Sequence, residues 1–413
     1  MPDRQAAGAR RLSWEERRFL FILGLPAFGI ALAYTLVTTY VPVLINELSG
    51  PTITGLLIAG EGLFALFIPV LVGGMSDQLR TRIGGRLPLI LIGGVIAVLA
   101  LILMPLGTTS LTWVAVALAI FFVGYFTYYT PYYALYPDLV PDDAHGRSQG
   151  FQGTLRSAGL LIALGGGGFL LSLGQPLPFF VGAAAIIVVT VGLYIGVRTG
   201  SAHGERHTDQ RGGFSASLTL LRTDVRIRHW FIANACWEAA IAGLRTFAVL
   251  YLTVGLGLSL AKASSALALV GVAALLAAPV AGKLADHYGD RRIMYLALWV
   301  FALGLTPAVV TTDMAFVATI VPVAFAAVVL MTLPYALLMG LLTRRSTHGT
   351  GAGLFGMSRG IGVLAGPLLA GIAADQAEHL SVLTFSDTQG YSAIFVVAAL
   401  MLFGSMPLLR RIT

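Results

Sequence analysis

The chain has 413 residues, of which 57% are apolar and only 11% are charged. Soluble domains carry about 25% charged residues, so this composition excludes the soluble globular and disordered classes. The single cysteine, Cys236, excludes a disulfide framework and a cysteine-based metal or iron–sulfur site. The formal charge of +7 would suit a nucleic-acid partner in a soluble protein. Here the basic residues lie between apolar runs, so we expect a lipid bilayer as the partner and no nucleic acid.

Apolar stretches recur along the whole chain, and each can cross ~30 Å of hydrocarbon as a helix. Twelve are expected, near residues 19–45, 52–75, 88–106, 112–137, 149–173, 177–198, 229–256, 262–282, 293–312, 314–342, 351–372 and 391–409. The first of them is too long for the apolar core of a signal peptide, so no cleavable signal is expected. We predict an all-α integral membrane fold with twelve transmembrane helices in two six-helix pseudo-repeats.

The polar stretches divide this fold into segments. We expect a cytoplasmic N-terminal segment (1–18), a first six-helix bundle (19–198), a cytoplasmic linker (199–228), a second bundle (229–409) and a cytoplasmic tail (410–413). The linker is rich in Gly, Ser and Arg and cannot bury a core, so it is predicted to be a solvated connection without a function of its own.

The distribution of basic residues predicts the orientation. With residue 1 inside, 22 of the 26 Lys and Arg residues fall on inner segments, and the outer loops carry only Lys262. The positive-inside rule therefore places both termini in the cytoplasm of a protein of the plasma membrane.

The two halves repeat each other. Residues 145–159 carry the pattern His-Gly-x3-Gly-x2-Gly-x2-Arg-x2-Gly, and residues 348–362 repeat it at a constant offset of 203. Parallel repeats of this kind are typical of transporters whose site lies at the midplane between the halves. Glycines spaced three or four apart predict close helix packing rather than chemistry.

One loop indicates a family. Residues 73–88 read Gly-Gly-Met-Ser-Asp-x2-Arg-Thr-Arg-x-Gly-Gly-Arg-x-Pro, which resembles the loop after the second helix of the major facilitator superfamily. Its Asp-x2-Arg-Thr-Arg-x-Gly-x3-Pro form is similar to the glycoside–pentoside–hexuronide:cation symporters and the sucrose carriers. The resemblance runs from end to end of the chain and implies secondary transport of a sugar or glycoside.

The coupling ion follows from a departure from that family. Melibiose-type members hold sodium with an acidic pair on the second helix, where this chain has Ala65 and Pro69. This departure argues against sodium. We expect H+ as the coupling ion, no cofactor and no metal.

Charged residues at the inner helix ends form a predicted cytoplasmic gate: Asp77, Arg82, Arg86, Asp138, Arg147, Asp286, Arg291 and Arg292. Arginine pairs bidentately with carboxylates, and such pairs can latch the inner mouth of a transporter. The alternative is ordinary topology signal and solvation of helix ends.

Five ionisable residues fall inside predicted helices: Glu61, Arg156, Glu238, Arg245 and Arg359. Each costs about 2.5–3.5 kcal/mol at the bilayer centre, so they are expected to face the bundle interior and to pair. Arg156 and Arg359 match across the repeat, which favours a shared structural or gating role over substrate contact. Glu61, Glu238 and Arg245 have no charged counterpart, which favours substrate or ion binding over buried structural pairing. Glu238 and Arg245 are seven residues apart, or about 10 Å along the axis, so they are not expected to pair with each other.

A carboxyl group in an apolar cavity favours its protonated form. Either Glu61 or Glu238 can therefore carry the coupled proton, and we prefer Glu61, which lies well inside the second helix.

The fourth helix is crowded with tyrosines at 125, 128, 129, 132, 133 and 136. Tyr125 and Tyr129 share one face and are candidates to stack on a sugar ring. The alternative is an aromatic belt at the membrane interface, to which we assign Tyr133 and Tyr136. Tyr34 and Asn234, polar residues on the first helix of each half, complete the predicted substrate and coupling residues.

These observations predict a proton-coupled secondary transporter that moves a sugar or glycoside by alternating access, and that functions as a monomer. A proton-driven exporter of amphipathic small molecules is the main alternative. The sequence contains no Ser/His/Asp arrangement, His-Glu-x2-His motif or phosphate loop, so a membrane enzyme is not expected. A non-transporting scaffold would have no use for unmatched charges inside the membrane.

Overall fold

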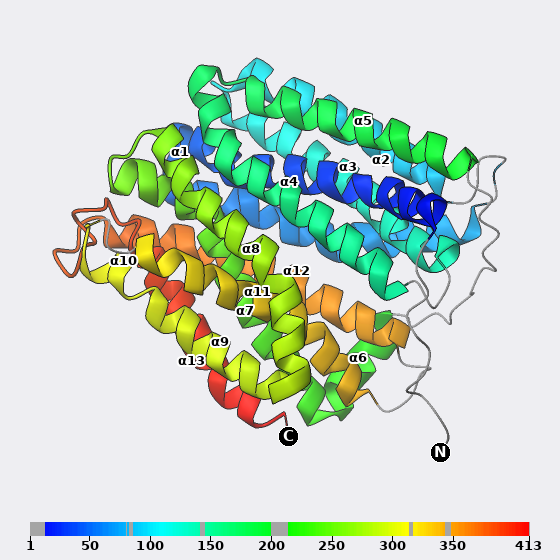
Figure 1. The fold of residues 1–413 in the computed structure, drawn as a ribbon. Helices are drawn as coiled ribbons and strands as arrows, with labels where there is room; N and C mark the ends of the chain where they lie inside the picture. Colours follow the sequence, from blue (N-terminus) through cyan, green and yellow to red (C-terminus); the bar gives the residue numbers. More distant parts are fainter. Residues whose placement is uncertain are drawn as a thin grey trace.

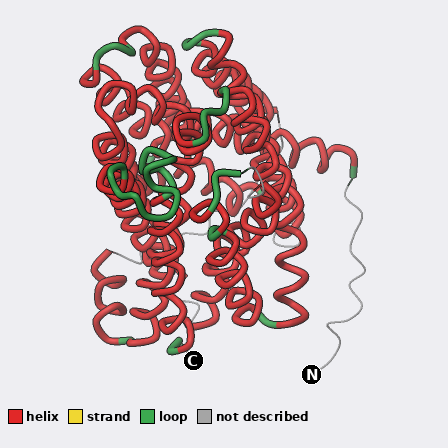
Figure 2. Tube along the Cα trace, turned by 90° about the vertical axis from the view of Figure 1, so that its left-hand side faces the viewer, coloured by secondary structure: helices red, strands yellow, loops and turns green. Residues whose placement is uncertain are grey.

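The structure is a computed structural model that describes residues 13–79, 81, 86–140, 145–199, 214–313, 317–342 and 348–412. These residues form helices joined by short turns, with no strand among them (Figure 2). The predicted all-α membrane fold is confirmed.

The first helix crosses the membrane twice. α1 (Trp14–Gln78) has 65 residues, which would measure about 98 Å if straight. Its backbone leaves the helical region at Gly50, where φ is 77° and ψ is −178°. Glycine adopts this conformation at little cost, and Pro51 suits the first turn of the helix that follows. α1 therefore contains the first two predicted membrane helices, folded back on each other at Gly50.

The remaining long helices each account for one predicted crossing, some with a short extension. The first half continues with α2 (Leu87–Leu103), α3 (Leu111–Leu139), α4 (His145–Leu173) and α5 (Leu177–Thr199). The second half contains α7 (Val225–Leu250), α8 (Leu260–Tyr288), α9 (Asp290–Gly304), α11 (Val317–Leu341), α12 (His348–Ala377) and α13 (Ala393–Arg410). Short turns extend three of them: η1 (Met104–Gly107), the π-helical η3 (Tyr251–Gly255) and α10 (Pro307–Val310). Among the described residues, eleven segments are long and apolar enough to cross a membrane. Since α1 crosses twice, they make twelve crossings.

Helix starts differ from the prediction at two places where local capping extends them. Residues 14–18 are helical rather than part of a polar segment, because Ser13 and Glu16 form a reciprocal capping box. α7 begins at Val225 rather than at residue 229, because the Asp224 side chain accepts hydrogen bonds from the first backbone N–H groups of the helix.

Part of the predicted linker is a helix. α6 (Phe214–Thr223) packs Leu220 and Leu221 against the core of the second half. The Ser217 hydroxyl donates to the Thr350 carbonyl of α12 at 3.2 Å. The linker was predicted to be a solvated connection that cannot bury a core, but these two leucines give the short helix an apolar face that packs on the second half. Residues 200–213 lie outside the described part.

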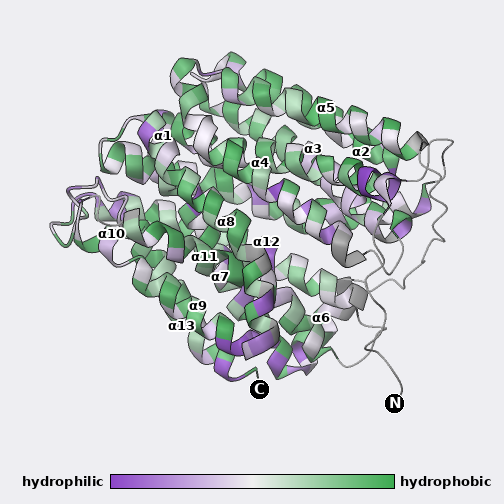
Figure 3. Ribbon diagram, in the orientation of Figure 1, coloured by the Kyte–Doolittle hydropathy of each residue, from purple (hydrophilic) through white to green (hydrophobic). Residues whose placement is uncertain are grey.

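The helices form two bundles with separate cores. One buried cluster draws only on residues between 20 and 193, a second only on residues between 227 and 412, and a third joins both halves. Figure 1 shows α2, α3 and α5 along one side of the molecule and α9 and α13 along the other. The outer helix faces carry exposed apolar side chains such as Leu71, Val188 and Leu276, as expected where lipid is the solvent. Figure 3 shows hydrophobic residues along most of the length of the helices, with hydrophilic residues mainly at helix ends, including those near the C-terminus.

The repeated glycine motif has the same packing role in both halves. A Cβ on Gly159 would lie 2.4 Å from the Phe28 carbonyl oxygen, and one on Gly362 would lie 2.6 Å from that of Ala235. The last glycine of each motif therefore lets its helix approach the first helix of its own half.

Candidate functional site

An ion pair joins the two halves near the middle of the helices. Glu61 lies in the second pass of α1, about 16 Å from Gly50 along the helix axis, and Arg245 lies on α7. Arg245 Nη2 donates to Glu61 Oε2 at 2.9 Å, and Arg245 Nη1 donates to the Tyr34 hydroxyl at 2.6 Å. The Tyr34 hydroxyl in turn donates to Glu61 Oε1. Glu61 is only 2% exposed and Tyr34 is buried, whereas the Arg245 side chain is 21% exposed.

A second ion pair lies within the second half. Glu238 on α7 faces Arg359 on α12, with 3.8 Å between Oε2 and Nε. Glu238 is buried, whereas the Arg359 side chain is 35% exposed. As the helical rise predicted, Glu238 and Arg245 do not pair with each other, and each has its partner on another helix.

Arg156 differs from its repeat counterpart Arg359. It is an exposed residue of α4, and no ion pair is recorded for it among the described residues. It acts electrostatically on Glu238 and on Tyr133. Glu238 interacts in the same way with Glu61, Arg245 and Arg359. All five ionisable residues predicted inside helices therefore belong to one electrostatic cluster, which we call the central cluster.

A column of tyrosines runs along the central cluster. Tyr34 stacks on Tyr125 with 4.7 Å between ring centroids, Tyr125 on Tyr129 at 5.6 Å, and Tyr129 lies 4.2 Å from Tyr133. Arg359 interacts electrostatically with the first three of these rings. The sequence reasoning assigned Tyr133 to an interfacial belt, but the structure places it in this column. The spacing 125, 129, 133 was the signal that could have included it.

The other tyrosines of α3 face the core of the first half. Tyr132 and Tyr136 both donate to the Leu23 carbonyl, at 2.8 and 3.1 Å, and both are fully buried. Tyr136 is therefore not part of an interfacial belt. Its hydroxyl finds a partner on α1, which explains why the ring can be buried.

Asn234 links two helices of the second half. Its Nδ2 donates to the Ser358 hydroxyl at 2.8 Å, next to Arg359 in the chain. The Asn234 side chain is fully buried, and its Oδ1 has no hydrogen-bond partner among the described residues. This predicted substrate residue thus lies behind the central cluster, between α7 and α12.

Two of the predicted gate residues pair with each other. Arg86 Nε lies 2.6 Å from Asp138 Oδ2, and Arg86 Nη2 lies 3.2 Å from Asp138 Oδ1, which makes the pair bidentate. It ties the start of α2 to the end of α3, within the first half. For the gate residues Asp77, Arg147 and Asp286 the structure describes only the helical backbone, and Arg82 lies outside the described residues.

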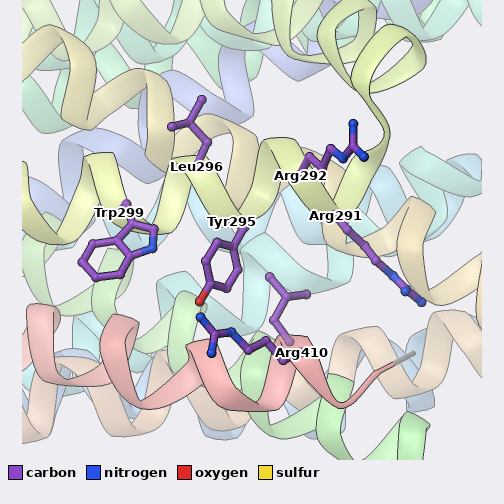
Figure 4. Close-up of a pocket in the computed structure, with 7 residues that line it drawn as sticks. Arg291, Arg292, Tyr295, Leu296, Trp299 and Arg410 are labelled. Atoms are coloured by element: carbon purple, nitrogen blue, oxygen red, sulfur yellow. The ribbon is translucent and has the colours of Figure 1, made fainter.

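The last two predicted gate residues lie on the second half. Arg291 and Arg292 line a groove of about 560 Å³ together with Arg410, Tyr295 and Trp299 (Figure 4). The groove is formed by α9 and α13, which both belong to the second half.

Contacts between the halves seal one end of the molecule, the end that holds Gly50 and the α7–α8 turn (the Gly50 end). The Tyr40 hydroxyl of α1 donates to the Leu164 carbonyl of α4 at 2.8 Å and lies 2.6 Å from the Ser264 hydroxyl of α8. Ser264 also accepts from the Gly168 N–H at 2.8 Å. Three helices from the two halves thus meet at one hydroxyl pair.

Close backbone approaches continue this seal between α1 and α12. A Cβ on Gly62 would lie 2.5 Å from the Gly360 carbonyl oxygen, and one on Gly55 would lie 2.3 Å from that of Pro367. Such distances leave no room for a side chain, so the two helices touch from the middle of the membrane to the Gly50 end.

Side-chain hydrogen bonds complete the contact at the surface. Thr52 donates to Asp375 at 3.0 Å, and Tyr391 donates to Asn46 at 2.7 Å. Burial raises the pKa of Tyr391 to about 12, so its hydroxyl keeps the proton that it donates.

The opposite end, where α1 begins and α13 ends (the terminal end), is less closely packed at the repeated motif. A Cβ on Gly150, Gly153 or Gly356 would meet only open space. Gly153 and Gly356 each lie one turn before an arginine of the central cluster. The prediction that the repeated glycines serve packing is therefore wrong for these three, which border space on the terminal side of the cluster.

Comparison with known proteins identifies the family. The model of the Major Facilitator Superfamily matches residues 27–274 and 230–412. The chain belongs to the major facilitator superfamily. It is accordingly a multi-pass membrane transporter that takes a small-molecule substrate, and not an enzyme.

Solved structures of other transporters have the same fold as this chain. A bacterial homologue of the human lysosomal transporter Spinster, in its inward-facing and unoccupied conformation, has a TM-score of 0.78 at 16% identity, over 97% of this chain and 98% of that chain. The nucleoside transporter NupG has a TM-score of 0.75 at 13% identity, over 94% of this chain and 98% of that chain. A search of curated protein sequences finds no match.

Proposed function

We propose that this transporter is proton-coupled and moves a sugar or glycoside by alternating access. The observation that carries the proposal is the Glu61–Arg245 pair, which joins the two halves near the membrane midplane. Alternating access is a rocking of one half against the other around a fixed midplane site. A charged contact across that boundary is where a change of protonation acts most directly on the equilibrium between the two states.

Glu61 is the proposed proton-coupling residue. Its carboxylate accepts from Arg245 and from Tyr34, so it is satisfied when ionised. A proton on Glu61 removes the charge that attracts Arg245 and weakens the bond between α1 and α7. Glu238 is the second candidate, but its partner Arg359 lies in the same half, so protonation there does not act across the boundary.

The tyrosine column supports a substrate with a ring. Tyr125, Tyr129 and Tyr133 are only partly buried, so each keeps some exposed ring surface besides the parts that stack on neighbouring rings. Aromatic faces stack on the apolar side of a sugar ring while neighbouring polar groups bind its hydroxyls. The resemblance to glycoside and sucrose carriers favours the same class. The alternative, export of amphipathic compounds, fits less well with five ionisable side chains in one cluster.

The arrangement also supports proposals on topology and assembly. We place both termini in the cytoplasm, and the protein in the plasma membrane, on the basis of its charge distribution. With this orientation the sealed Gly50 end would face outward. One chain supplies every residue of the central cluster, so the functional unit is a monomer.

Transport into proteoliposomes tests the proposal. Vesicles containing the purified protein would be given labelled glucose, sucrose, maltose or methyl glucoside, with and without an imposed pH gradient. We expect accumulation of at least one sugar that an uncoupler abolishes. Gradient-driven extrusion of a cationic dye without sugar uptake would instead support the exporter.

Matched variants test the coupling residue. Glu61→Gln should abolish uphill accumulation while keeping exchange of labelled for unlabelled sugar, because exchange needs no net proton movement. Glu238→Gln, which removes a carboxylate from the same cluster, should keep proton-driven accumulation. If Glu61→Gln still accumulates sugar against a gradient, the assignment is wrong.

A further inference from the structure

The connection between α12 and α13, residues 378–392, is a compact loop with an unusual backbone. Leu383 and Gln389 have positive φ angles of 56° and 51°, which residues other than glycine adopt only where surrounding contacts hold them. Gly390 has a φ of 80°, and a Cβ there would lie 1.9 Å from the Ala374 carbonyl oxygen of α12. The loop therefore closes tightly on α12. We call it the strap, and Figure 1 shows it at the end of the molecule away from both chain termini.

Buried hydroxyl groups fix the strap to the second half. The N–H and the hydroxyl of Thr384 both donate to the Val309 carbonyl of α10, at 3.2 and 2.8 Å. The Thr388 hydroxyl donates to the Thr384 carbonyl at 2.7 Å and lies 2.8 Å from the Ser392 hydroxyl. A Cβ on Gly255, at the end of η3, would lie 3.2 Å from the Thr388 carbonyl oxygen. These contacts all lie within the second half, so the strap must move with that half as one unit.

Tyr391 connects the strap to the first half. Its hydroxyl donates to Asn46 Oδ1 of α1 at 2.7 Å, and the residue is only 3% exposed, so water has little access to this bond. Its ring lies near that of Phe247 on α7, with 6.4 Å between ring centroids. For the described residues, no other hydrogen bond between the strap and the first half is recorded. One tyrosine on a rigid loop therefore makes the polar contact across the boundary.

This bond differs from the other polar contacts between the halves at the Gly50 end. The bond from Thr52 to Asp375 lies at the exposed surface, where water can replace either partner at little cost. The Tyr40 hydroxyl also contacts the other half, but it donates to Leu164 of its own half and keeps that bond if the halves separate. The recorded partner of the Tyr391 hydroxyl is Asn46 alone. Separation of the halves therefore removes the hydrogen bond that this buried hydroxyl makes.

We propose that the strap is a conformational latch, in which the bond from Tyr391 to Asn46 holds the Gly50 end closed and sets how often that end opens. Because the strap is fixed to the second half, opening must break this bond outright and cannot be absorbed by a flexible loop. Loss of the bond shifts the equilibrium toward the open state by the free energy of one shielded hydrogen bond. The latch acts on the opening of one end, so it does not depend on which substrate or ion is carried.

The labelling rate of a buried cysteine tests the latch. Ala263 lies at the Gly50 end of α8 and is fully buried in the cluster that joins both halves. Ala263→Cys, in a Cys236→Ser background, would be treated in detergent with a water-soluble maleimide, and its labelling rate should follow the fraction of molecules open at that end. Tyr391→Phe keeps the ring and removes the hydroxyl, so the rate should rise roughly fivefold, as for the loss of one hydrogen bond.

The partner residue provides a second arm of the test. Asn46→Ala removes the acceptor and should raise the labelling rate of Ala263→Cys by a similar or larger factor. The variant that combines Asn46→Ala with Tyr391→Phe should be labelled no faster than the faster of the two single variants, because the same bond is lost in each. Multiplied effects of the two substitutions would mean that these side chains act separately, which would overturn the proposal.

Matched controls separate opening from unfolding. Tyr128→Phe removes another buried tyrosine hydroxyl, one that accepts from Thr190 at 3.1 Å within the first half, so it should leave the labelling rate of Ala263→Cys unchanged. A reporter in the core of the first half, Ala100→Cys, should be labelled equally slowly with and without Tyr391→Phe. An unchanged rate at Ala263→Cys in Tyr391→Phe, an equal rise in Tyr128→Phe, or a parallel rise at Ala100→Cys would each overturn the latch. None of these outcomes bears on the proposed sugar transport, since no sugar or proton gradient is used.

Discussion

Arg245→Gln is expected to destabilise the protein more than removal of any exposed arginine. The substitution leaves the Glu61 carboxylate 2% exposed and without its cationic partner, with only the Tyr34 hydroxyl as a donor. Removing one partner of a buried ion pair costs about 3–5 kcal/mol, because the remaining charge stays desolvated. The control Arg226→Gln breaks a 3.4 Å pair whose arginine is 52% exposed, which is worth at most about 1 kcal/mol.

The double variant Glu61→Gln/Arg245→Gln supplies the decisive comparison. It removes both charges together, so no uncompensated carboxylate remains, and replacing both members of a buried pair is often close to neutral. We therefore expect the double variant to be more stable than Arg245→Gln alone, with a coupling energy of about 2 kcal/mol or more.

The single cysteine makes the measurement simple. Cys236 is half-buried on α7, so reaction with a thiol-sensitive dye reports unfolding of the helix that carries Arg245. The order of melting temperatures should be wild type, then the double variant, then Arg245→Gln. Additive effects of the two single substitutions would refute the reasoning, because they would mean that Glu61 and Arg245 do not interact.

Other substitutions test the packing around the site. Gly62→Ala should abolish transport without unfolding the protein, because its Cβ would come within 2.5 Å of a carbonyl oxygen of α12 and hold the halves apart; Gly60→Ala, where the Cβ meets open space, should transport normally. Tyr40→Phe should lower stability by about 1 kcal/mol in chemical unfolding, since it loses its bonds to the α4 backbone and to a serine of α8. Arg86→Asp should impair uptake, and the exchange with Asp138→Arg should restore part of it if the bidentate pair matters; failure of the exchanged pair would show that position, not pairing, is what counts.

The fold could be predicted because a bilayer leaves few alternatives for a chain of this composition. Apolar runs of sufficient length must be helices, since the backbone has no water to bond to. The sequence did not predict some local details of the helices. The helix start at Ser13 and the short helix α6 depend on caps and on two leucines, signals that are weak beside a membrane span.

The site was predictable in its membership but not in its pairing. The cost of burying charge was enough to single out the five ionisable residues, and the helical rise correctly excluded a bond between Glu238 and Arg245. Neither argument could identify the partner of each residue. Glu61 and Arg245 are far apart in the sequence and meet only when the two helix bundles pack together. Tyr133 was missed for a different reason. Its spacing of four residues from Tyr129 indicated a place in the same column, but its depth was judged from the expected position of the membrane interface, which the sequence does not mark.

The two ion pairs of the central cluster have different consequences for a rocking motion. The Glu238–Arg359 pair moves as part of one bundle, so it persists whichever end is open. The Glu61–Arg245 pair spans the boundary and lies beside the glycine contacts of α1 and α12, which must separate when the Gly50 end opens. Those glycine contacts are van der Waals contacts that protonation cannot change, whereas a proton on Glu61 directly weakens the charged contact beside them. Under the proposed proton coupling, this pair is therefore the contact between the halves through which a proton gradient would bias which end is open.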